Sequence, residues 1–440
     1  MKFYIKKLGC PKNDVDADYI AGMLIADGHT RVDCDVDADA VVVNTCGFIL
    51  PAKEESIAEI LYYEKLRKAG AIFRLYLTGC LSQRYGSEIL KEIDGVDGIF
   101  GIGQLEQLRQ TIQADSAIRL GNGLGQAVDS GYIAGSKRFV DTIYPYEYLK
   151  ISDGCDRFCS YCAIPLIRGR YRSRPLDDIV TEARLLAEHG KKEVILVSQE
   201  GTAYGRDRGD VSVIDLLRAL ETIDGIAWIR LMYLHPESLT EKLIEYMTAS
   251  EKVLGYFDMP LQHINKRILK KMNRRITRDR IERLITTIRD ASPDNIIRTT
   301  FIAGFPGETD KEFDELEAFI ADIEFDRLGV FAYSCEENTA AAGFNDQIPD
   351  KLAEERRDRL MMLQQQIAFL KNIALIGSTQ HVIIDQSDDR NDAVGRTRGD
   401  CPEIDQSVII RGRKLAVGDM LDVEITMAEG YDLIAGNKDL

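Results

Sequence analysis

The sequence predicts an α/β chain of three parts: a parallel-sheet α/β domain, a partial (β/α)6 barrel and a small antiparallel β-barrel of the OB-like type. Strand-like and helix-like periodicities alternate over most of the chain, and a Gly- and Ser-rich stretch interrupts them between about 121 and 144. Short strands separated by Gly and Asp turns fill the C-terminal region. We expect domains at 1–130, 147–368 and 369–440, and a linker at 131–146.

The first domain repeats a strand–helix order. Strand-like runs at 3–8, 40–44 and 72–77 alternate with helical patterns at 14–26 and 52–68. A βαβαβ order predicts a parallel sheet, because each crossover helix returns the chain to the same end of the sheet.

Three cysteines each follow one of these strands: Cys10, Cys46 and Cys80. Their spacings of 36 and 34 residues match one β–α unit each. Open α/β sheets bind ligands at the carboxyl ends of their strands, so we expect the three thiols to converge and hold a metal cluster. The alternative is that small, apolar cysteines are simply buried at strand ends. Cys34 lies in an acidic loop and is left out of the predicted site.

The middle part carries six strand-like runs separated by helical patterns, which predicts the partial barrel. The strands are expected at 148–152, 193–198, 228–233, 254–259, 296–302 and 327–333, with helices such as 178–188, 238–247, 278–291 and 311–323. Active sites of such barrels lie at the carboxyl ends of the strands. A charged amphipathic helix at 350–370 then leads to strands at 381–384, 407–410 and 420–426.

A second cysteine triplet, Cys155, Cys159 and Cys162, follows the first barrel strand at spacing C-x3-C-x2-C. Iron–sulfur clusters normally take four thiolates, so three close thiols leave one iron open to another ligand. A structural zinc site expects four ligands, usually as two pairs, and no second pair follows here. Cys401 is remote from both triplets and is interpreted as incidental, like Cys335.

Other strand ends carry polar residues. Gln199 and Glu200 follow the second strand, and the fifth leads into Gly304-Phe-Pro-Gly-Glu308. The glycines Gly304 and Gly307 would let the backbone approach a ligand closely, and Glu308 would accept from a ribose or an ammonium group. Alternatively, the segment is a turn before a helix, with Glu308 favourable in its first turn. His235 and His263, at other strand ends, are interpreted as structural.

The spacing of Cys155, Cys159 and Cys162 resembles that of the radical S-adenosylmethionine (SAM) superfamily, and the C-terminal barrel resembles the TRAM domain. The whole chain resembles the methylthiotransferase family, in the branch that modifies an aspartate of ribosomal small-subunit protein 12 (the RimO type). The motifs concerned are Gly-Cys-Pro-Lys-Asn from Gly9, Thr-Cys-Gly-Phe-Ile from Thr45, Cys-Ser-Tyr-Cys-Ala-Ile-Pro ending at Pro165, Asp-Met-Pro-Leu-Gln-His from Asp258 and Pro-Glu-Ile-Asp from Pro402. Two departures are Gln199-Glu-Gly-Thr in place of Gln-Asp-Thr-Thr, which leaves the role of Glu200 open, and Cys401 in place of Ala.

The resemblance implies two 4Fe–4S clusters, SAM and an external electron donor. The catalytic cluster on Cys155, Cys159 and Cys162 would reduce SAM to methionine and a 5′-deoxyadenosyl radical, which abstracts a hydrogen from the β-carbon of the aspartate. The cluster on Cys10, Cys46 and Cys80 would hold or supply sulfur, which a second SAM methylates. Gln199, Glu200, Gly304, Gly307 and Glu308 would contact SAM.

The composition of the chain limits the kinds of partner that it can bind. The 440 residues carry a net charge of −16 and no apolar run of membrane-spanning length, so a cytoplasmic protein without membrane contact is expected. Nine cysteines in such a protein favour metal binding over disulfides. Residues 371–440 hold 8 Lys and Arg against 13 Asp and Glu, a net −5. We therefore expect docking of a basic ribosomal protein, with Asp385, Asp388, Asp389 and Asp392 contributing, and no stable nucleic-acid binding.

Two other functions remain open on the sequence alone. The same machinery would serve for methylthiolation of a tRNA adenosine, and a noncatalytic iron–sulfur scaffold or electron carrier would also explain clustered cysteines. A carrier, however, needs neither two triplets with an open iron nor a six-unit barrel.

Overall fold

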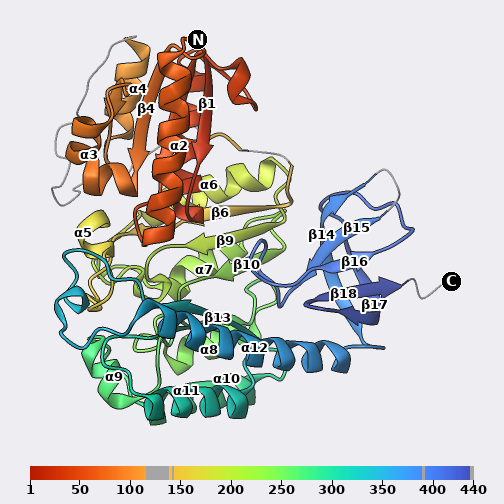
Figure 1. Cartoon of the computed structure of the whole chain (residues 1–440). Coiled ribbons are helices and arrows are strands. Elements are labelled where there is room, and N and C mark those ends of the chain that lie inside the picture. The colour runs from red at the N-terminus through yellow and green to blue at the C-terminus, as the bar shows by residue number, and fades with distance from the viewer. Residues whose placement is uncertain (115–137, 141–142, 389–391, 437–440) are drawn as a thin grey trace. The chain divides into compact units, whose positions relative to one another are not determined.

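A computed structural model of the chain describes residues 1–114, 138–140, 143–388 and 392–436 (Figure 1). The chain forms two compact units, and each combines segments that are distant in sequence. The first contains Met1–Val140, Lys150–Asp178 and Ser334–Ala342, and the second contains Asp141–Leu149, Ile179–Tyr333 and Gly343–Leu440. Most of the predicted linker at 131–146 lies outside the described residues, and the predicted domain boundaries remain predictions.

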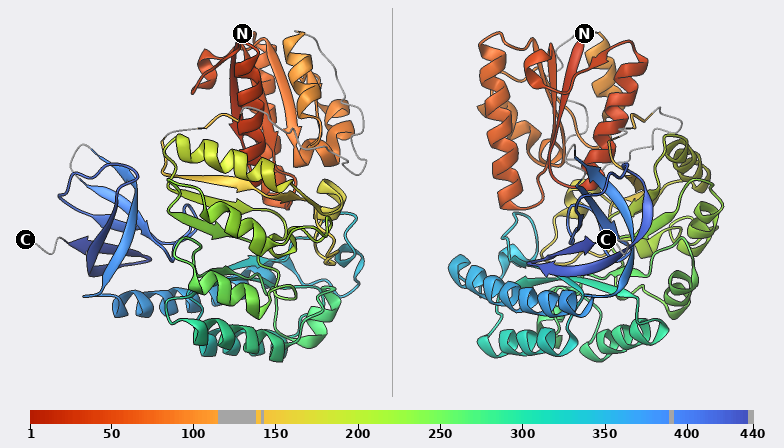
Figure 2. Two further views of the ribbon diagram at one scale, coloured as in Figure 1. Left: turned by 180° about the vertical axis from the view of Figure 1, so that it is seen from behind. Right: turned by 90° about the vertical axis from the view of Figure 1, so that its right-hand side faces the viewer.

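The first unit is built on a parallel sheet of order β2-β1-β3-β4-β5, as the βαβαβ pattern predicted. Its strands are β1 (Lys2–Lys7), β2 (Thr30–Arg31), β3 (Ala40–Thr45), β4 (Arg74–Gly79) and β5 (Gly98–Ile99). The strand β3 is buried along its whole length, which is typical of parallel strands covered by helices on both faces. Figure 2 shows helices on either side of this sheet.

The helices of this unit are α1 (Pro11–Ala26), α2 (Leu50–Lys68), α3 (Cys80–Glu92) and α4 (Leu105–Gln113), with a short 3-10 turn η1 (Asp35–Asp37). Proline stands in the first turn of both α1 and α2, where its missing N–H leaves no intrahelical bond unmade. Ile60 and Tyr63 of α2 pack on Val41, Val43 and Leu75 of the sheet, and all of these side chains are buried. The cysteine loop adds β7 (Ser152–Asp153), which pairs antiparallel with β8 (Arg172–Ser173), and the short helix α5 (Ile164–Arg168).

The second unit contains the predicted partial barrel. The barrel consists of two three-stranded sheets, of order β10-β9-β6 and β11-β12-β13. A parallel bridge links Ile229 of β10 to Val253, three residues before β11. The strands are β6 (Tyr146–Lys150), whose last residue belongs to the first unit, β9 (Glu193–Val197), β10 (Trp228–Leu231), β11 (Tyr256–Asp258), β12 (Ile296–Ala303) and β13 (Arg327–Ala332). Each corresponds to one of the six runs expected from the sequence.

Helices alternate with these strands. They are α6 (Leu176–Glu188), α7 (Val213–Glu221), α8 (Glu241–Ala249), α9 (Lys266–Lys271), α10 (Arg278–Ala291) and α11 (Asp310–Ile323), with 3-10 turns η2 (Gly201–Ala203) and η3 (Ala341–Gly343). The start of α11 is fixed by a capping box, in which Thr309 accepts from the Glu312 backbone N–H and Glu312 accepts from that of Thr309. This box immediately follows the Gly304–Glu308 turn, so it fixes where the turn ends.

The long helix α12 (Asp350–Ala374) leads to a closed five-stranded barrel of order β14-β15-β16-β18-β17. Its strands are β14 (Thr379–Ser387), β15 (Ala393–Thr397), β16 (Val408–Ile410), β17 (Met420–Glu429) and β18 (Asp432–Gly436). Neighbours pair antiparallel except β16 and β18, which pair parallel. Alternate residues such as Val382, Ile384, Val423 and Ile425 fill the interior.

Several acidic residues of this barrel are buried in ion pairs. Asp385 pairs with Arg396, which also pairs with Glu193 at the start of β9. Asp400 pairs with Arg327 at the start of β13. The expectation that Asp385 contributes to a docking surface is therefore wrong, because a charge count does not distinguish buried from exposed carboxylates. Asp389 lies outside the described residues.

Candidate active site

The cysteines Cys10, Cys46 and Cys80 lie at one edge of the first sheet. Cys10 precedes α1, Cys46 directly follows β3, and Cys80 is the first residue of α3 after β4. Because β1, β3 and β4 are neighbours in register, their carboxyl ends bring the three thiols together. Among the described residues none of the nine cysteines forms a disulfide. The convergence expected from the spacing is present, and the role of these thiols as ligands remains a prediction.

Electrostatic coupling between these thiols reflects their proximity. Burial, together with the neighbouring Cys80 and Cys10 thiols, raises the pKa of Cys46 to about 12. Burial also raises the pKa of Cys80, although the Arg168 guanidinium opposes this effect. Gly9 has a φ of +99°, and a Cβ there would lie 2.7 Å from the Cys46 Cβ. The loops are thus packed closely enough that a side chain at position 9 would displace Cys46.

The second triplet lies in the same unit, in the loop between β7 and α5. The Cys162 N–H donates to the Cys159 carbonyl at 3.0 Å, and the Cys155 N–H donates to the Gly169 carbonyl at 3.1 Å. The Arg157 N–H donates to the Cys155 sulfur at 3.5 Å. All three thiols are half-buried. Backbone hydrogen bonds therefore hold the loop, and its three thiols are partly exposed. This arrangement suits a cluster that a substrate must reach.

The two triplets are adjacent. Cys80 packs against Ala163 and Ile167, which directly follow the second triplet. Within the described ranges no three His, Cys, Asp or Glu side chains converge as a single metal ion requires. A four-iron cluster makes no such demand, because its cysteines bind different irons.

Sequence reasoning missed the charged residues between the triplets. Arg168, at the end of α5, donates to the Cys80 sulfur at 3.6 Å and to Asp153 at 3.1 Å. The sequence does contain a signal for such residues. A charged residue inside an apolar run beside a cysteine motif must pair with a buried partner.

The segment Ser334–Ala342 was also missed. Glu336 is buried and accepts from Lys53 at 2.8 Å and from Arg84 at 2.7 Å. At the other end of the segment, the Ala341 N–H donates to the Ser160 carbonyl at 2.8 Å, inside the second cysteine loop. Arg84 also donates to the carbonyl of Gly47, next to Cys46. This segment therefore contacts the loops of both triplets.

The predicted SAM-contacting residues belong to the second unit. Both amide atoms of Gln199 are buried and have no hydrogen-bond partner in the described part of the chain, as expected for a side chain that contacts a ligand. Glu200 is buried and accepts from the Ser238 hydroxyl at 3.1 Å. The substitution of Glu for the expected Asp is thus accommodated by a partner on the next βα unit.

Packing contacts within the protein explain several residues of the Gly304–Glu308 turn. Gly304 has a φ of +73°, and a Cβ there would lie 2.2 Å from the Ala353 Cβ. Glu308 is buried, accepts from Arg356 at 2.8 Å and lies near His263. Gly304 and Glu308 therefore serve the packing of α12 against the turn, whereas Gly307 packs beside Asp346 and Lys271. The contact of all three with SAM stays a prediction.

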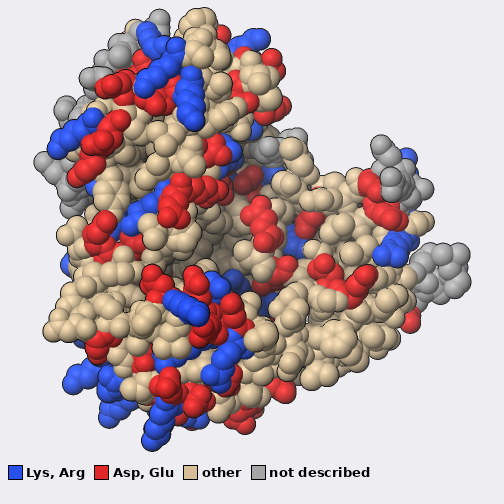
Figure 3. Space-filling view, in the orientation of Figure 1, with Lys and Arg blue, Asp and Glu red and all other residues tan. Residues whose placement is uncertain are grey.

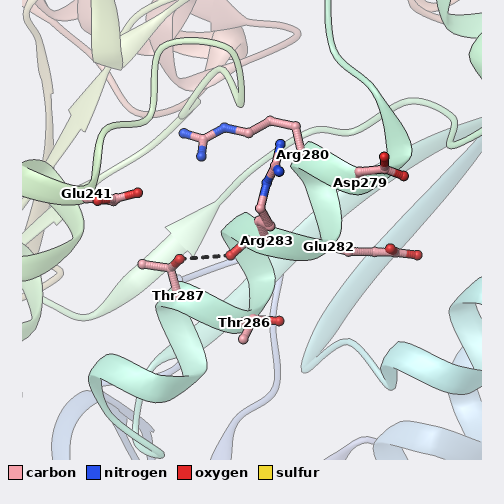
Figure 4. A pocket seen from close by; sticks show the side chains of 7 residues that line it. All are labelled: Glu241, Asp279, Arg280, Glu282, Arg283, Thr286 and Thr287. Carbon is pink, nitrogen blue, oxygen red and sulfur yellow. Dashed lines mark hydrogen bonds between the residues drawn. The ribbon is translucent and has the colours of Figure 1, made fainter.

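A polar hollow on the second unit is lined by none of the predicted site residues (Figure 4). Residues of α8 and α10 line it with mixed charges, and the Thr287 hydroxyl donates to the carbonyl of Arg283 in the same helix. On the face shown in Figure 3, Lys and Arg are interspersed with Asp and Glu. None of the helices in the described ranges has the length and apolar character that a bilayer span needs.

Each of the three parts of the chain matches a known protein family. Residues 149–320 match the Radical SAM superfamily, residues 2–101 match the uncharacterized protein family UPF0004, and residues 376–436 match the TRAM domain. The chain is 42% identical over 436 residues to the ribosomal protein uS12 methylthiotransferase RimO of Clostridioides difficile, covering 99% of this chain and 98% of that protein. It is 44% identical to the RimO of Thermosipho africanus, with 98% of each chain covered. This chain belongs to the RimO family.

Like other radical SAM proteins, a RimO-family member with this domain uses SAM and a 4Fe–4S cluster. The fold is also similar to that of solved radical SAM enzymes. The methyltransferase TsrM from Kitasatospora setae, solved with cobalamin and a 4Fe–4S cluster, aligns with a TM-score of 0.54 at 16% identity, covering 75% of this chain and 74% of that one. The cobalamin-dependent enzyme OxsB aligns with a TM-score of 0.53 at 11% identity, covering 82% of this chain and 56% of that one. At these identities the likeness concerns the fold alone.

Proposed function

We propose that this chain transfers a methylthio group to the β-carbon of an aspartate in ribosomal protein uS12. The observation that carries the proposal is the pair of cysteine triplets in one compact unit, since the two parts of the reaction need two iron sites. The names of the full-length relatives support the substrate. A ribosomal substrate would place the enzyme in the cytoplasm.

In this proposal Cys155, Cys159 and Cys162 hold the cluster that supplies the electron for SAM cleavage, and Cys10, Cys46 and Cys80 hold a second 4Fe–4S cluster that supplies sulfur. The protein's part is to provide thiolates, orient SAM and exclude water. All three thiols of the second triplet are half-buried, whereas in the first triplet Cys46 and Cys80 are buried and Cys10 is half-buried, so the second triplet is the more accessible of the two. An external donor would deliver the electron.

Gln199 is the best-supported SAM contact, because its buried amide lacks partners in the described part of the chain. Gly304, Gly307, Glu200 and Glu308 complete the proposed contact set. Arg356 donates to one carboxylate oxygen of Glu308 and holds the side chain in place, while the other, buried oxygen has no hydrogen-bond partner in the described residues and is the one we assign to SAM.

Mass spectrometry of uS12 and of bulk tRNA from a deletion strain tests the substrate. The proposal predicts that uS12 loses one methylthio group, that the gene restores it, and that tRNA modification is unchanged. Loss of a methylthio group from a tRNA adenosine, with uS12 unaltered, would replace the proposed substrate by tRNA. Purified RNA alone should form no stable complex with the enzyme.

A further inference from the structure

Arg168 is a buried cation at the junction of the two triplets. Its side chain is 1% exposed, although it ends the helix α5, only six residues after Cys162. Nη1 lies 3.1 Å from both carboxylate oxygens of Asp153, which stands two residues before Cys155. Nη2 donates to the Asn13 side-chain oxygen at 2.7 Å and to the Cys80 sulfur at 3.6 Å. The guanidinium therefore contacts both cysteine motifs at once.

Asn13 extends this contact to the other strands of the first sheet. Its amide nitrogen donates to the carbonyl of Leu8 at 2.9 Å and to that of Thr45 at 3.0 Å. Leu8 directly follows β1 and lies two residues before Cys10, and Thr45 ends β3 and directly precedes Cys46. Arg168 and Asn13 together thus fix the ends of all three strands that carry the first triplet.

Charge balance alone does not explain this arrangement. Asp153 and Asp16 are buried beside two cations, Arg168 and Lys150, so the four groups neutralise one another. A lysine at position 168 would preserve that balance. What only a guanidinium provides is a planar fork, with one nitrogen on the carboxylate and the other on Asn13 and the sulfur.

Hydrogen bonds to cluster sulfurs stabilise the more negative, reduced state and so raise the reduction potential. We propose that Arg168 is a positioning residue for the cluster on Cys10, Cys46 and Cys80. It holds the Cys80 sulfur by a charge-assisted hydrogen bond and fixes it against the Cys155–Cys162 loop through Asp153. The inference rests on the second cluster of the proposed function.

The test isolates the first-triplet cluster. Protein carrying Cys155→Ala, Cys159→Ala and Cys162→Ala is reconstituted anaerobically, and the remaining cluster is followed by iron content and by an EPR-monitored redox titration. Arg168→Lys and Arg168→Gln are compared in this background. The matched control is Arg170→Gln, because Arg170 is two residues away, 69% exposed and paired only with Asp156 among the ion pairs of the described residues.

We expect Arg168→Lys to retain its iron but to shift the reduction potential downward and alter the EPR signal, with a larger shift in Arg168→Gln. Arg170→Gln should match its parent. An iron-loaded Arg168→Lys protein with the parent's reduction potential and EPR signal would overturn the inference. This holds even if its melting temperature fell, because a purely structural arginine predicts lower stability with unchanged cluster properties. A parent without iron would instead overturn the second cluster itself, and the inference with it.

Discussion

Arg396 of the C-terminal barrel donates from Nη1 to Glu193 of β9 at 2.6 Å, and the two side chains are only 3% and 0% exposed. The same carboxylate accepts from Arg230 at 2.8 Å, whose other nitrogens donate to the carbonyls of Arg398 and Asp400. Glu193 thus pairs with both arginines, Asp385 also pairs with Arg396, and Arg230 holds the 398–400 turn of the barrel against β10 of the same unit.

Glu193→Gln should lower the free energy of unfolding by about 3–5 kcal/mol, because removing one partner of a buried ion pair leaves a charge uncompensated. Urea unfolding measures the loss. Glu188→Gln, an exposed glutamate at the end of α6, is the matched control and should change stability by no more than about 0.5 kcal/mol. Equal stability of Glu193→Gln and wild type would show that the two arginines are not held by this carboxylate.

The turn glycine Gly304 should tolerate no side chain. Gly304→Ala combines a φ of +73° with a Cβ 2.2 Å from that of Ala353, so we expect a loss of about 2–4 kcal/mol. Adding Ala353→Gly should restore part of it by removing the clash. Gly343→Ala, where no atom lies within 4 Å of the added Cβ, is the control. If the double variant is as unstable as Gly304→Ala, the loss of stability comes from backbone strain and not from the clash with Ala353.

The capping box before α11 should make stability depend on pH. Burial by itself would raise the pKa of Glu312, but hydrogen bonds from Arg267 and Thr309 outweigh it and lower the pKa from 4.5 to about 2. A carboxylate whose folded pKa is depressed contributes stability above its unfolded pKa and loses it as pH falls toward the folded value.

The gap in unfolding free energy between wild type and Glu312→Gln should therefore be widest at pH 7 and narrow as pH falls below 4.5. Urea unfolding across this range tests it. Asp322→Asn, exposed on the same helix, should show no such trend. A gap that stays constant down to pH 3 would mean that the ionised form of Glu312 is not the stabilising one.

The fold followed from sequence because its signals are local. The six barrel strands and the helix α10, at Arg278–Ala291, have apolar periodicities that tertiary contacts did not override. The cysteine convergence was also predictable, since parallel strands place their carboxyl ends at one edge. The sequence did not predict which side chains pair when they are far apart along the chain. Arg168 with Cys80, or Glu336 with Arg84, depends on packing that no spacing rule describes.

Iron content should separate the two triplets. Anaerobically reconstituted wild type should bind about eight irons, and alanine at Cys10, Cys46 and Cys80, or at the second triplet, should leave about four. Only the second change should abolish formation of 5′-deoxyadenosine. Cys34 and Cys335 are exposed, and Cys401 is buried in the second unit whereas both triplets belong to the first, so alanine at each should leave iron unchanged. Full iron in the first triple variant would contradict the two-cluster interpretation.

The acidic surface available for substrate docking is smaller than the net charge of the C-terminal region implies. Asp385, Asp400 and Asp405 are buried and paired with Arg396, Arg327 and Arg298, whereas the turn Arg411-Gly-Arg-Lys414 is exposed. Asp388 is exposed, and Asp392 is half-buried with its carboxylate accepting from the Gly412 N–H.

Asp388→Lys should weaken binding of purified uS12, and the weakening should shrink as salt rises, because exposed charges are screened within about 10 Å at 0.1 M salt. Glu429→Lys makes the same charge change at the β17–β18 turn and should have less effect if docking is local to Asp388. Damage to the 388–392 turn alone would weaken binding equally at every salt concentration. Replacing Arg411, Arg413 and Lys414 by Glu should leave uS12 binding intact or strengthen it, and loss of binding in that variant would move the docking surface to the basic turn.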